Sequence, residues 1–292
     1  MVILKNNYLQ VELDPKGAEI AKVIGNEDHI NYMWKQDPSL WGHSAPILFP
    51  IVGALKNGKT NIEGKSYSMN QHGFSRNSVY EVEESDDTHV VFHLHESEET
   101  KTMYPYSFDL YVTYTLEDNV LKADLEVVNE RDDHIMFQIG GHPAFACPFM
   151  EGESANDYYV EFSQNETVSS KVIYPARGGM SHELKPLFEN ERRFFVRQAL
   201  FNSDAIVVPH FKSEAVALKS INHDKSLVFH MEGFDHLGLW TSNHVGGLLA
   251  IEPWVGHTDY VDFNGEFKDK EGIVTLNKGE RFHCQFKIEI NQ

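Results

Sequence analysis

The chain has 292 residues, 41% of them hydrophobic, and its 44 acidic against 25 basic residues give a formal net charge of -19. That charge argues against nucleic acid and anionic membrane surfaces as partners. The length and composition suit one packed domain, because strand-rich sandwiches often reach this size without dividing.

The cysteines and the N-terminus predict a cytoplasmic protein. Cys147 and Cys284 could form one disulfide, but they are not spaced as a zinc-type pair, and the pattern favours reduced, buried thiols. The apolar start of the chain ends at Lys5, without the basic start and long apolar core of a signal peptide. No apolar run approaches the length of a membrane span.

Apolar residues alternate with polar ones along most of the chain, which is typical of half-buried β-strands. This alternation predicts strands over residues 9–13, 90–94, 108–114, 121–127 and 282–290, and apolar runs predict buried strands at 135–139 and 248–251. The turn at 117–119 predicts a hairpin between its two neighbours. The chain is therefore expected to be all-β, a single domain over residues 1–292 built as a large antiparallel β-sandwich.

Helical periodicity is scarce. Residues 38–42 could form one helical turn, with Asp37 as its cap. Residues 189–200 are the longest candidate helix, although three arginines and two phenylalanines weaken its pattern. The sequence has no fixed-period repeat and no low-complexity segment.

The stretch from residue 248 to 262 carries the most informative carboxylate. An apolar run ends at Glu252, and Pro253 cannot donate to a sheet ladder, so we expect the strand to stop or become an edge there. Trp254 then offers a flat face for sugar C–H groups or a cation. A carboxylate in this setting should have a raised pKa, which suits a general base near neutral pH. The alternative is a surface glutamate at a turn.

A second stretch places His142 between Gly141 and Pro143, directly after the predicted strand 135–139. Glycines at 140 and 141 allow close approach of a ligand or another backbone, and the proline holds the histidine extended. His142 could act as a proton donor near neutral pH. The alternative is a structural histidine that is hydrogen-bonded in the core.

Two further stretches offer polar groups to a ligand. His72 and Arg76 could donate to sugar hydroxyls, a ring oxygen or a phosphate, or Arg76 could form a surface ion pair. Asp204, before the apolar run 205–208, could accept hydrogen bonds from vicinal hydroxyls, or simply form a turn or cap.

Metal and nucleophile motifs are weak. His93 and His95 share a strand face and could bind a metal, but no third ligand has a persuasive spacing. There is no phosphate-cradling glycine loop and no glycine-flanked serine of the hydrolase type. We therefore predict no metal site and no cofactor.

Taken in order, these stretches resemble the aldose 1-epimerase (mutarotase) family, and the resemblance spans most of the chain. It rests on residues 46–53, His72-Gly73-Phe74, Tyr104-Pro105-Tyr106, the segment 141–145, Leu239-Trp240-Thr241 and the segment 251–254. It is closest to the bacterial aldose epimerase-like proteins associated with lactose and galactose utilisation operons. The implied fold is the galactose mutarotase-like β-sandwich, or supersandwich, in agreement with the strand pattern.

The resemblance implies a reaction and its residues. Such enzymes interconvert the α and β anomers of a free hexose, such as galactose or glucose, by ring opening and closure, without a metal or organic cofactor. Glu252 would take the proton of the anomeric hydroxyl and His142 would protonate the ring oxygen. The sugar would be bound by His72, Arg76, Asp204, Trp240 and Trp254. The expected partner is a hexose alone, bound by a monomer or homodimer.

Departures from the family pattern leave the substrate open. The arginine that galactose mutarotases carry in the first lining segment is missing from residues 49–55, and Gly141 replaces the asparagine before the catalytic histidine. Asp204 is followed by Ala205 rather than histidine. One alternative is a hexose-6-phosphate 1-epimerase, which would gather several arginines. Another is a non-catalytic sugar-binding or regulatory protein on the same fold.

A glycosidase is the remaining alternative. It would need a second carboxylate opposite Glu252, and Asp235 and Asp259 are the candidates. Nothing in the sequence sets the separation of these groups.

Overall fold

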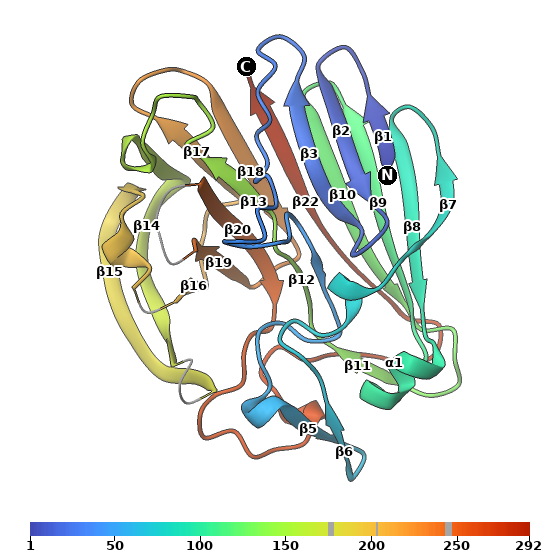
Figure 1. Cartoon of the computed structure of the whole chain (residues 1–292). Helices are drawn as coiled ribbons and strands as arrows, with labels where there is room; N and C mark the ends of the chain where they lie inside the picture. The colour runs from blue at the N-terminus through green and yellow to red at the C-terminus, as the bar shows by residue number, and fades with distance from the viewer. Residues whose placement is uncertain (175–177, 203, 243–246) are drawn as a thin grey trace.

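The structure is a computed structural model that describes residues 1–174, 178–202, 204–242 and 247–292. Within these ranges the regular structure is overwhelmingly β, with a single α-helix, α1 (Glu98–Met103) (Figure 1). None of the helices in these ranges is long and apolar enough to cross a membrane. The predicted all-β class is confirmed.

The largest element is a sheet of fifteen strands within the described ranges, and the pairings along it are antiparallel. Its main path runs through β4 (Ile47–Leu48), β12 (Ile139–Gly141), β20 (Gly247–Val255), β19 (His236–Trp240), β16 (Ile206–Pro209), β14 (Tyr158–Tyr174), β17 (Ala215–Ser220), β18 (Ser226–Glu232), β22 (Arg281–Asn291), β10 (Val120–Val128), β9 (Asp109–Glu117), β8 (His89–His95) and β7 (Glu81–Ser85). Off this path, β13 (Ala144–Cys147) pairs with β20, and β15 (Gly179–Phe195) pairs with β14.

Three smaller sheets complete the strands of the described ranges. They are formed by β1 (Val2–Lys5), β2 (Leu9–Asp14) and β3 (Glu19–Gly25), by β5 (Lys59–Ile62) and β6 (Lys65–Ser68), and by β11 (Ile135–Phe137) and β21 (Val274–Leu276). Short 3-10 helices lie in the connections between strands: η1 (Lys56–Gly58), η2 (Ser75–Asn77), η3 (Ala155–Asp157), η5 (Gln198–Leu200) and η6 (Phe267–Asp269).

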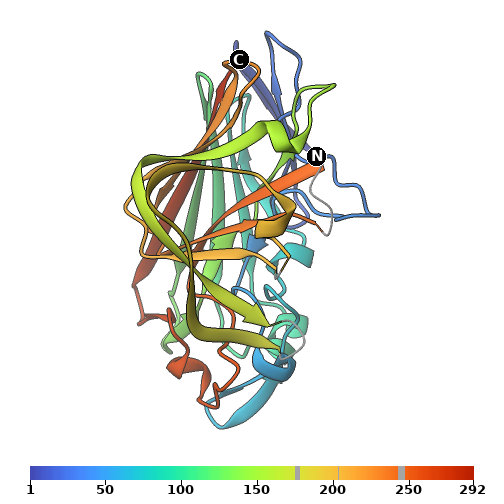
Figure 2. The ribbon, with the colours of Figure 1, turned by 90° about the vertical axis from the view of Figure 1, so that its left-hand side faces the viewer.

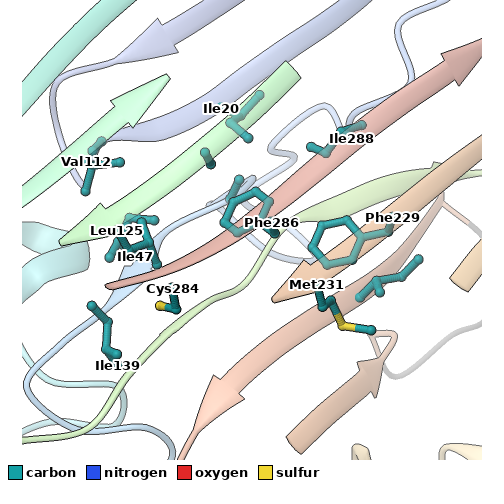
Figure 3. Packing of buried hydrophobic residues seen from close by; sticks show 14 of the residues in the cluster. Ile20, Ile47, Val112, Leu125, Ile139, Phe229, Met231, Cys284, Phe286 and Ile288 are labelled. Atoms are coloured by element: carbon teal, nitrogen blue, oxygen red, sulfur yellow. The ribbon is translucent and has the colours of Figure 1, made fainter. Parts of the chain in front are cut away.

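The main core lies between two layers. The sheet β1–β2–β3 faces the half of the large sheet that contains β8, β9 and β10 (Figure 1). Ile20 of β3 lies in one buried cluster with Val112 of β9, Leu125 of β10 and Phe286 of β22 (Figure 3). Each such side chain stabilises the fold by about 1.5–3 kcal/mol relative to an exposed one. These layers confirm the antiparallel sandwich.

The strands predicted from alternation are present. β2, β8, β10 and β22 contain four of the predicted segments, β9 contains the fifth except for residue 108, and Glu117 pairs with Val120 across the predicted hairpin. The stretch 135–139 divides into β11 and β12, which pair in different sheets. Cys147 and Cys284 are buried free thiols, as expected.

The predicted helix over residues 189–200 is wrong. Most of this segment belongs to β15, which forms a long twisted ribbon with β14 along one side of the molecule (Figure 2). Phe194 pairs with Val160, and the guanidinium of Arg193 lies 5.4 Å from the ring centre of Tyr159. Cross-strand contacts of aromatic side chains stabilise strands, and here they outweigh the weak helical pattern.

Candidate active site

Glu252 lies inside β20 rather than at a strand end, so the predicted stop at Pro253 is wrong. β20 continues to Val255 and pairs with β19 there, with Gly238 opposite Glu252. On the other side, the N–H of Ile251 donates to the carbonyl of Pro143, between β12 and β13. The nitrogen of Pro253, two residues later, faces the same interruption. The hydrogen bonds between strands are already broken there, so the absence of an N–H on Pro253 costs none of them. A central strand tolerates proline at such a site.

His142 occupies the interruption between β12 and β13. Its backbone N–H donates to the carbonyl of Pro46 at 3.1 Å. Its Nε2 lies 3.2 Å from Oε2 of Glu252, although the pair lacks the alignment of a hydrogen bond. A Cβ on Gly140 would lie 2.7 Å from the carbonyl oxygen of Pro253, so glycine permits the close approach expected there. Neighbouring strands thus bring an imidazole and a carboxyl group into contact.

All the predicted catalytic and sugar-binding residues line a single cavity of about 450 Å³. This volume falls within the range of small-molecule sites, about 300–1,000 Å³. The lining consists of Trp41, Gly53, Ala54, Gln71, His72, Arg76, His142, Ile173, Gly178, Gly179, Asp204, Ala205, Trp240, Glu252, Trp254 and Thr258. Segments that are distant in sequence therefore converge as the ordered set of motifs suggests.

Burial shifts the two central groups in opposite directions. Removal from water raises the pKa of Glu252 well above its usual range, and the carboxylate of Asp204 adds to the rise. Removal from water lowers the pKa of His142 well below its usual range, and the neighbouring imidazole of His72 adds to the fall. Both shifts favour uncharged side chains. The directions of the two shifts thus favour a protonated Glu252 beside a neutral His142.

His72 and Arg76 reach the cavity from the segment around η2. Nδ1 of His72 accepts the N–H of Gly53 at 3.1 Å, so the neutral ring carries its proton on Nε2 and can donate it. Burial lowers the pKa of His72 to about 3, which keeps the ring neutral. Nε of Arg76 is buried and has no hydrogen-bond partner among the described residues, unlike the surface ion pair considered as the alternative.

Asp204 precedes β16 and adds a second carboxylate. Its Oδ1 accepts the N–H of Ala205 at 2.7 Å, and burial raises the pKa of its carboxyl group. Its φ of 98° and that of His72, 67°, lie in a region that side-chain-bearing residues rarely adopt. Strained backbone of this kind concentrates at functional sites.

Trp41 is a lining residue that the sequence analysis did not select. Its indole stacks on the His142 ring, with ring centres 4.6 Å apart, and meets Trp240 edge-on at 5.6 Å. The predicted single turn after Asp37 is present: the N–H of Trp41 donates to the carbonyl of Asp37, and Oδ1 of Asp37 caps the turn by accepting the N–H of Ser39. The one available signal was the tryptophan itself, because so large an apolar side chain is seldom left in solvent.

Trp254 depends on a glycine in the neighbouring strand. A Cβ on Gly238 would lie 2.6 Å from Cζ2 of Trp254, and its nearest neighbours would all be indole atoms. The indole therefore lies against the bare backbone of β19. Its Nε1 is buried without a hydrogen-bond partner among the described residues, which leaves a donor at the cavity.

The other candidate groups lie outside the cavity. Asp235 is engaged by the ring of His236, and Asp259 pairs with the buried ammonium of Lys270, so neither faces Glu252 as a glycosidase partner would. Both ring nitrogens of His93 contact carboxylates, those of Glu83 and Asp109. His93 therefore has no free nitrogen for a metal on the strand face that it shares with His95.

Comparison with known proteins shows the family of the chain. Residues 1–289 match the model of the aldose 1-epimerase family. The chromosomal LacX protein of Lactococcus lactis subsp. lactis is 33% identical over 280 residues, which is 94% of this chain and 93% of that protein.

Solved structures give the same answer. A galactose mutarotase related enzyme from Lactobacillus acidophilus is 30% identical, with a TM-score of 0.93 over 99% of this chain and 97% of its own. A galactose mutarotase-like protein from Lactobacillus casei is 26% identical, with a TM-score of 0.93 over 100% of both chains. With its β-sandwich fold and a family match over nearly its whole length, the chain belongs to the aldose 1-epimerase family.

Proposed function

We propose that this protein is an aldose 1-epimerase that interconverts the α and β anomers of a free hexose, with Glu252 and His142 as its acid–base pair. The observation that supports this most is the 3.2 Å contact between a buried carboxyl group and a buried imidazole at the cavity. The anomeric hydroxyl oxygen and the ring oxygen of a hexose are bonded to the same carbon. One acid and one base in contact can therefore serve both oxygens.

Ring opening transfers two protons between the sugar and this pair. Glu252 takes the proton of the anomeric hydroxyl while His142 gives a proton to the ring oxygen, and the bond between C1 and the ring oxygen breaks. The product is the open-chain aldehyde, with Glu252 protonated and His142 neutral. Rotation about the C1–C2 bond presents the other aldehyde face. The reverse transfers then close the ring to the other anomer and restore both groups.

The pKa shifts support this cycle. They favour a protonated Glu252 beside a neutral His142, which is the form that the pair has when the sugar is open. Transfer of that proton across the short contact gives the other form, in which Glu252 is the base and His142 the acid. Neither form requires a net gain or loss of protons from solvent.

The cavity lining favours an unphosphorylated sugar. Arg76 is the one arginine or lysine that lines it within the described ranges, whereas phosphate is commonly bound by several such groups. His72 and Arg76 would donate to the ring oxygen and hydroxyls, and Asp204 would accept from hydroxyls. The indoles of Trp240 and Trp254 would pack against C–H groups. The lining comes from one chain, so a monomer would be competent, and we place the reaction in the cytoplasm.

Polarimetry or NMR exchange on fresh galactose, glucose and glucose 6-phosphate tests the proposal. We expect wild type to speed anomer exchange of a free hexose, and Glu252→Gln to lose about 10²–10⁴-fold of that rate. Glu289→Gln is the control, because this partly exposed carboxylate pairs with His230 far from the cavity lining.

Three outcomes would contradict the proposal. A rate equal to buffer on every sugar, together with sugar binding, would make the protein a sugar sensor. Acceleration of glucose 6-phosphate alone would make it a hexose-6-phosphate epimerase. Full activity in Glu252→Gln would show that the carboxyl group of Glu252 takes no part in proton transfer.

A further inference from the structure

A second polar cluster lies beside the sugar cavity, and the proposed reaction does not use it. It consists of His236 in β19, His257 just after β20, and Glu271 just before β21. The side-chain atoms that could bind a metal all lie within 4.8 Å of one another. The histidines are 3% and 2% exposed, whereas the glutamate side chain is 51% exposed.

Both histidines are oriented through the ring nitrogen that faces away from the cluster. Nδ1 of His236 donates to Oδ1 of Asp235 at 2.8 Å, and Nδ1 of His257 donates to the carbonyl of Thr258 at 2.7 Å. With the proton on Nδ1, the neutral form of each ring has its lone pair on Nε2. Metal-binding histidines are held in this way, with the other N–H given to a carboxylate or a carbonyl.

The two Nε2 atoms are buried and have no hydrogen-bond partner among the described residues. A buried acceptor without a partner is unfavourable. Here two such acceptors belong to rings whose centres are 5.0 Å apart, and Oε1 of Glu271 lies 3.5 Å from Nε2 of His257. A single cation between the three side chains would satisfy all of them.

We propose that His236, His257 and Glu271 form a binding site for a divalent transition metal, with Zn²⁺ as the best fit. Two imidazole nitrogens and one carboxylate oxygen, plus a water molecule, complete the four ligands that zinc prefers. Imidazole ligands disfavour Mg²⁺ and Ca²⁺, which require mostly oxygen.

Binding requires a modest contraction of the cluster. Bonds of about 2.0–2.2 Å to a tetrahedral zinc place neighbouring ligand atoms about 3.3 Å apart, closer than the widest separation here. Glu271 can supply part of this movement because its side chain is half exposed, and the imidazole of His236 must supply the rest. The ammonium of Lys171 lies 3.5 Å from Oε1 of Glu271 and competes for that oxygen. We therefore expect weaker binding than at a closed four-ligand zinc site.

The alternative is an ion pair between a protonated His257 and Glu271, which would need no metal. The two arrangements differ in a direct way. A protonated ring has no lone pair to give to a cation, so the ion pair predicts no specific metal binding.

The metal site would brace one wall of the sugar cavity. His236 pairs with Trp254 across β19 and β20, and His257 donates to Thr258, and both of these partners line the cavity. A metal would thus join β19 to the segments that follow β20 and precede β21. The site is separate from the acid–base pair, so it does not depend on the proposed function.

Calorimetric titration of untagged, chelator-treated protein with Zn²⁺ tests this site, with Mg²⁺ as the comparison. We expect one specific Zn²⁺ equivalent per chain, no comparable Mg²⁺ binding, and a higher unfolding temperature with Zn²⁺. Co²⁺ should bind at the same place and give visible absorption bands. Glu271→Gln and His257→Ala should each weaken Zn²⁺ binding by at least about 10–100-fold.

His283→Ala is the matched control, because this half-exposed histidine pairs with Asp124 and should leave the specific equivalent intact. The proposal is overturned if wild type takes up no specific Zn²⁺, or if Glu271→Gln binds as tightly as wild type. Should His257→Ala fail to fold, Glu271→Gln still decides, because its side chain is half exposed.

Discussion

Two buried glutamates of this protein differ in what surrounds them. Glu166 in β14 is 3% exposed and Glu252 in β20 is 1% exposed. Oε1 of Glu166 accepts three hydrogen bonds, from the N–H of Lys212 and from the N–H and hydroxyl of Ser213, at 2.7–2.9 Å. Oε2 of Glu252 touches His142 but has no hydrogen bond among the described residues.

The difference teaches that burial alone does not identify a reactive carboxyl group. Three fixed donors hold Oε1 of Glu166, so this side chain anchors the loop before β17. Glu252 lacks the three hydrogen bonds that hold Glu166, because the Trp254 indole is the one side-chain donor that acts on its carboxyl group, and burial raises its pKa, which favours the protonated form. A buried group with missing partners and a reaction partner in contact is the informative combination.

The largest expected effect concerns the contact itself. We expect His142→Asn to lose about 10²–10⁴-fold of the anomer-exchange rate. Because one proton moves between the two groups, the double variant with Glu252→Gln should be little slower than the slower single variant. NMR exchange measures all three rates, and His283→Asn serves as the control. Losses that multiply in the double variant would show that the two groups act separately.

The second prediction concerns Glu166. Glu166→Ala leaves the N–H groups of Lys212 and Ser213 without their acceptor, which should lower the free energy of unfolding by about 3 kcal/mol. The anomer-exchange rate of the folded protein should stay close to that of wild type. Urea unfolding and NMR exchange measure the two quantities. If Glu166→Ala lost most of the rate at unchanged stability, Glu166 would take part in the reaction, and the structural role that we assign to it would be wrong.

The third prediction is a gain of stability at the expense of activity. The raised pKa of Glu252 means that the fold is most stable below the usual glutamic acid range and loses stability as the pH rises toward the raised value. The neutral amide of the Glu252→Gln variant has no such proton to lose. The free energy of unfolding of this variant should therefore exceed that of wild type by about 1 kcal/mol near pH 8. Below about pH 4.5 the two values should be equal.

Urea unfolding at the two pH values measures this difference, with Glu289→Gln as the surface control. A gain that was equal at both pH values would mean that the amide packs better, and that the charge of Glu252 is not the cause.

The smallest expected effect concerns Asp204. Its carboxylate contributes to the raised pKa of Glu252, so Asp204→Asn should lower that pKa. The alkaline limb of the kcat profile, where the pair loses its shared proton, should move to lower pH. Asp262→Asn, on an exposed carboxylate paired with His182, is the control. An unmoved limb with a higher KM would restrict Asp204 to sugar binding.

Much of the fold could be predicted because alternation and turns are local signals. β9 and β10 bury every second residue, and the polar residues 117–119 between them are typical of a turn. The segment 189–200 could not be predicted this way, because pairing with β14 decides its conformation. The predicted strand end at Pro253 was wrong for a similar reason. The proline is tolerated because residues 141–143, between β12 and β13, interrupt the pairing beside it, and the local sequence around Pro253 does not show this.

The site residues were predictable to the extent that they carry distinctive neighbours. His142 and Glu252 stand beside glycine, proline and tryptophan, and these flanks gave the ordered motifs. Trp41 has no such context, and its stacking on His142 depends on the tertiary fold. The cluster of His236 and His257 with its carboxylate is likewise invisible in the sequence, because it forms only when β19 pairs with β20.

The contact between Gly238 and Trp254 has a consequence for the evolution and redesign of this protein. No side chain can enter position 238 while the indole lies there, and a smaller residue at 254 would remove that restriction. The two positions are therefore expected to change together among relatives that accept bulkier sugars. A library that aims at a wider substrate range should vary both positions at once, because either change made alone would give a clash or a void.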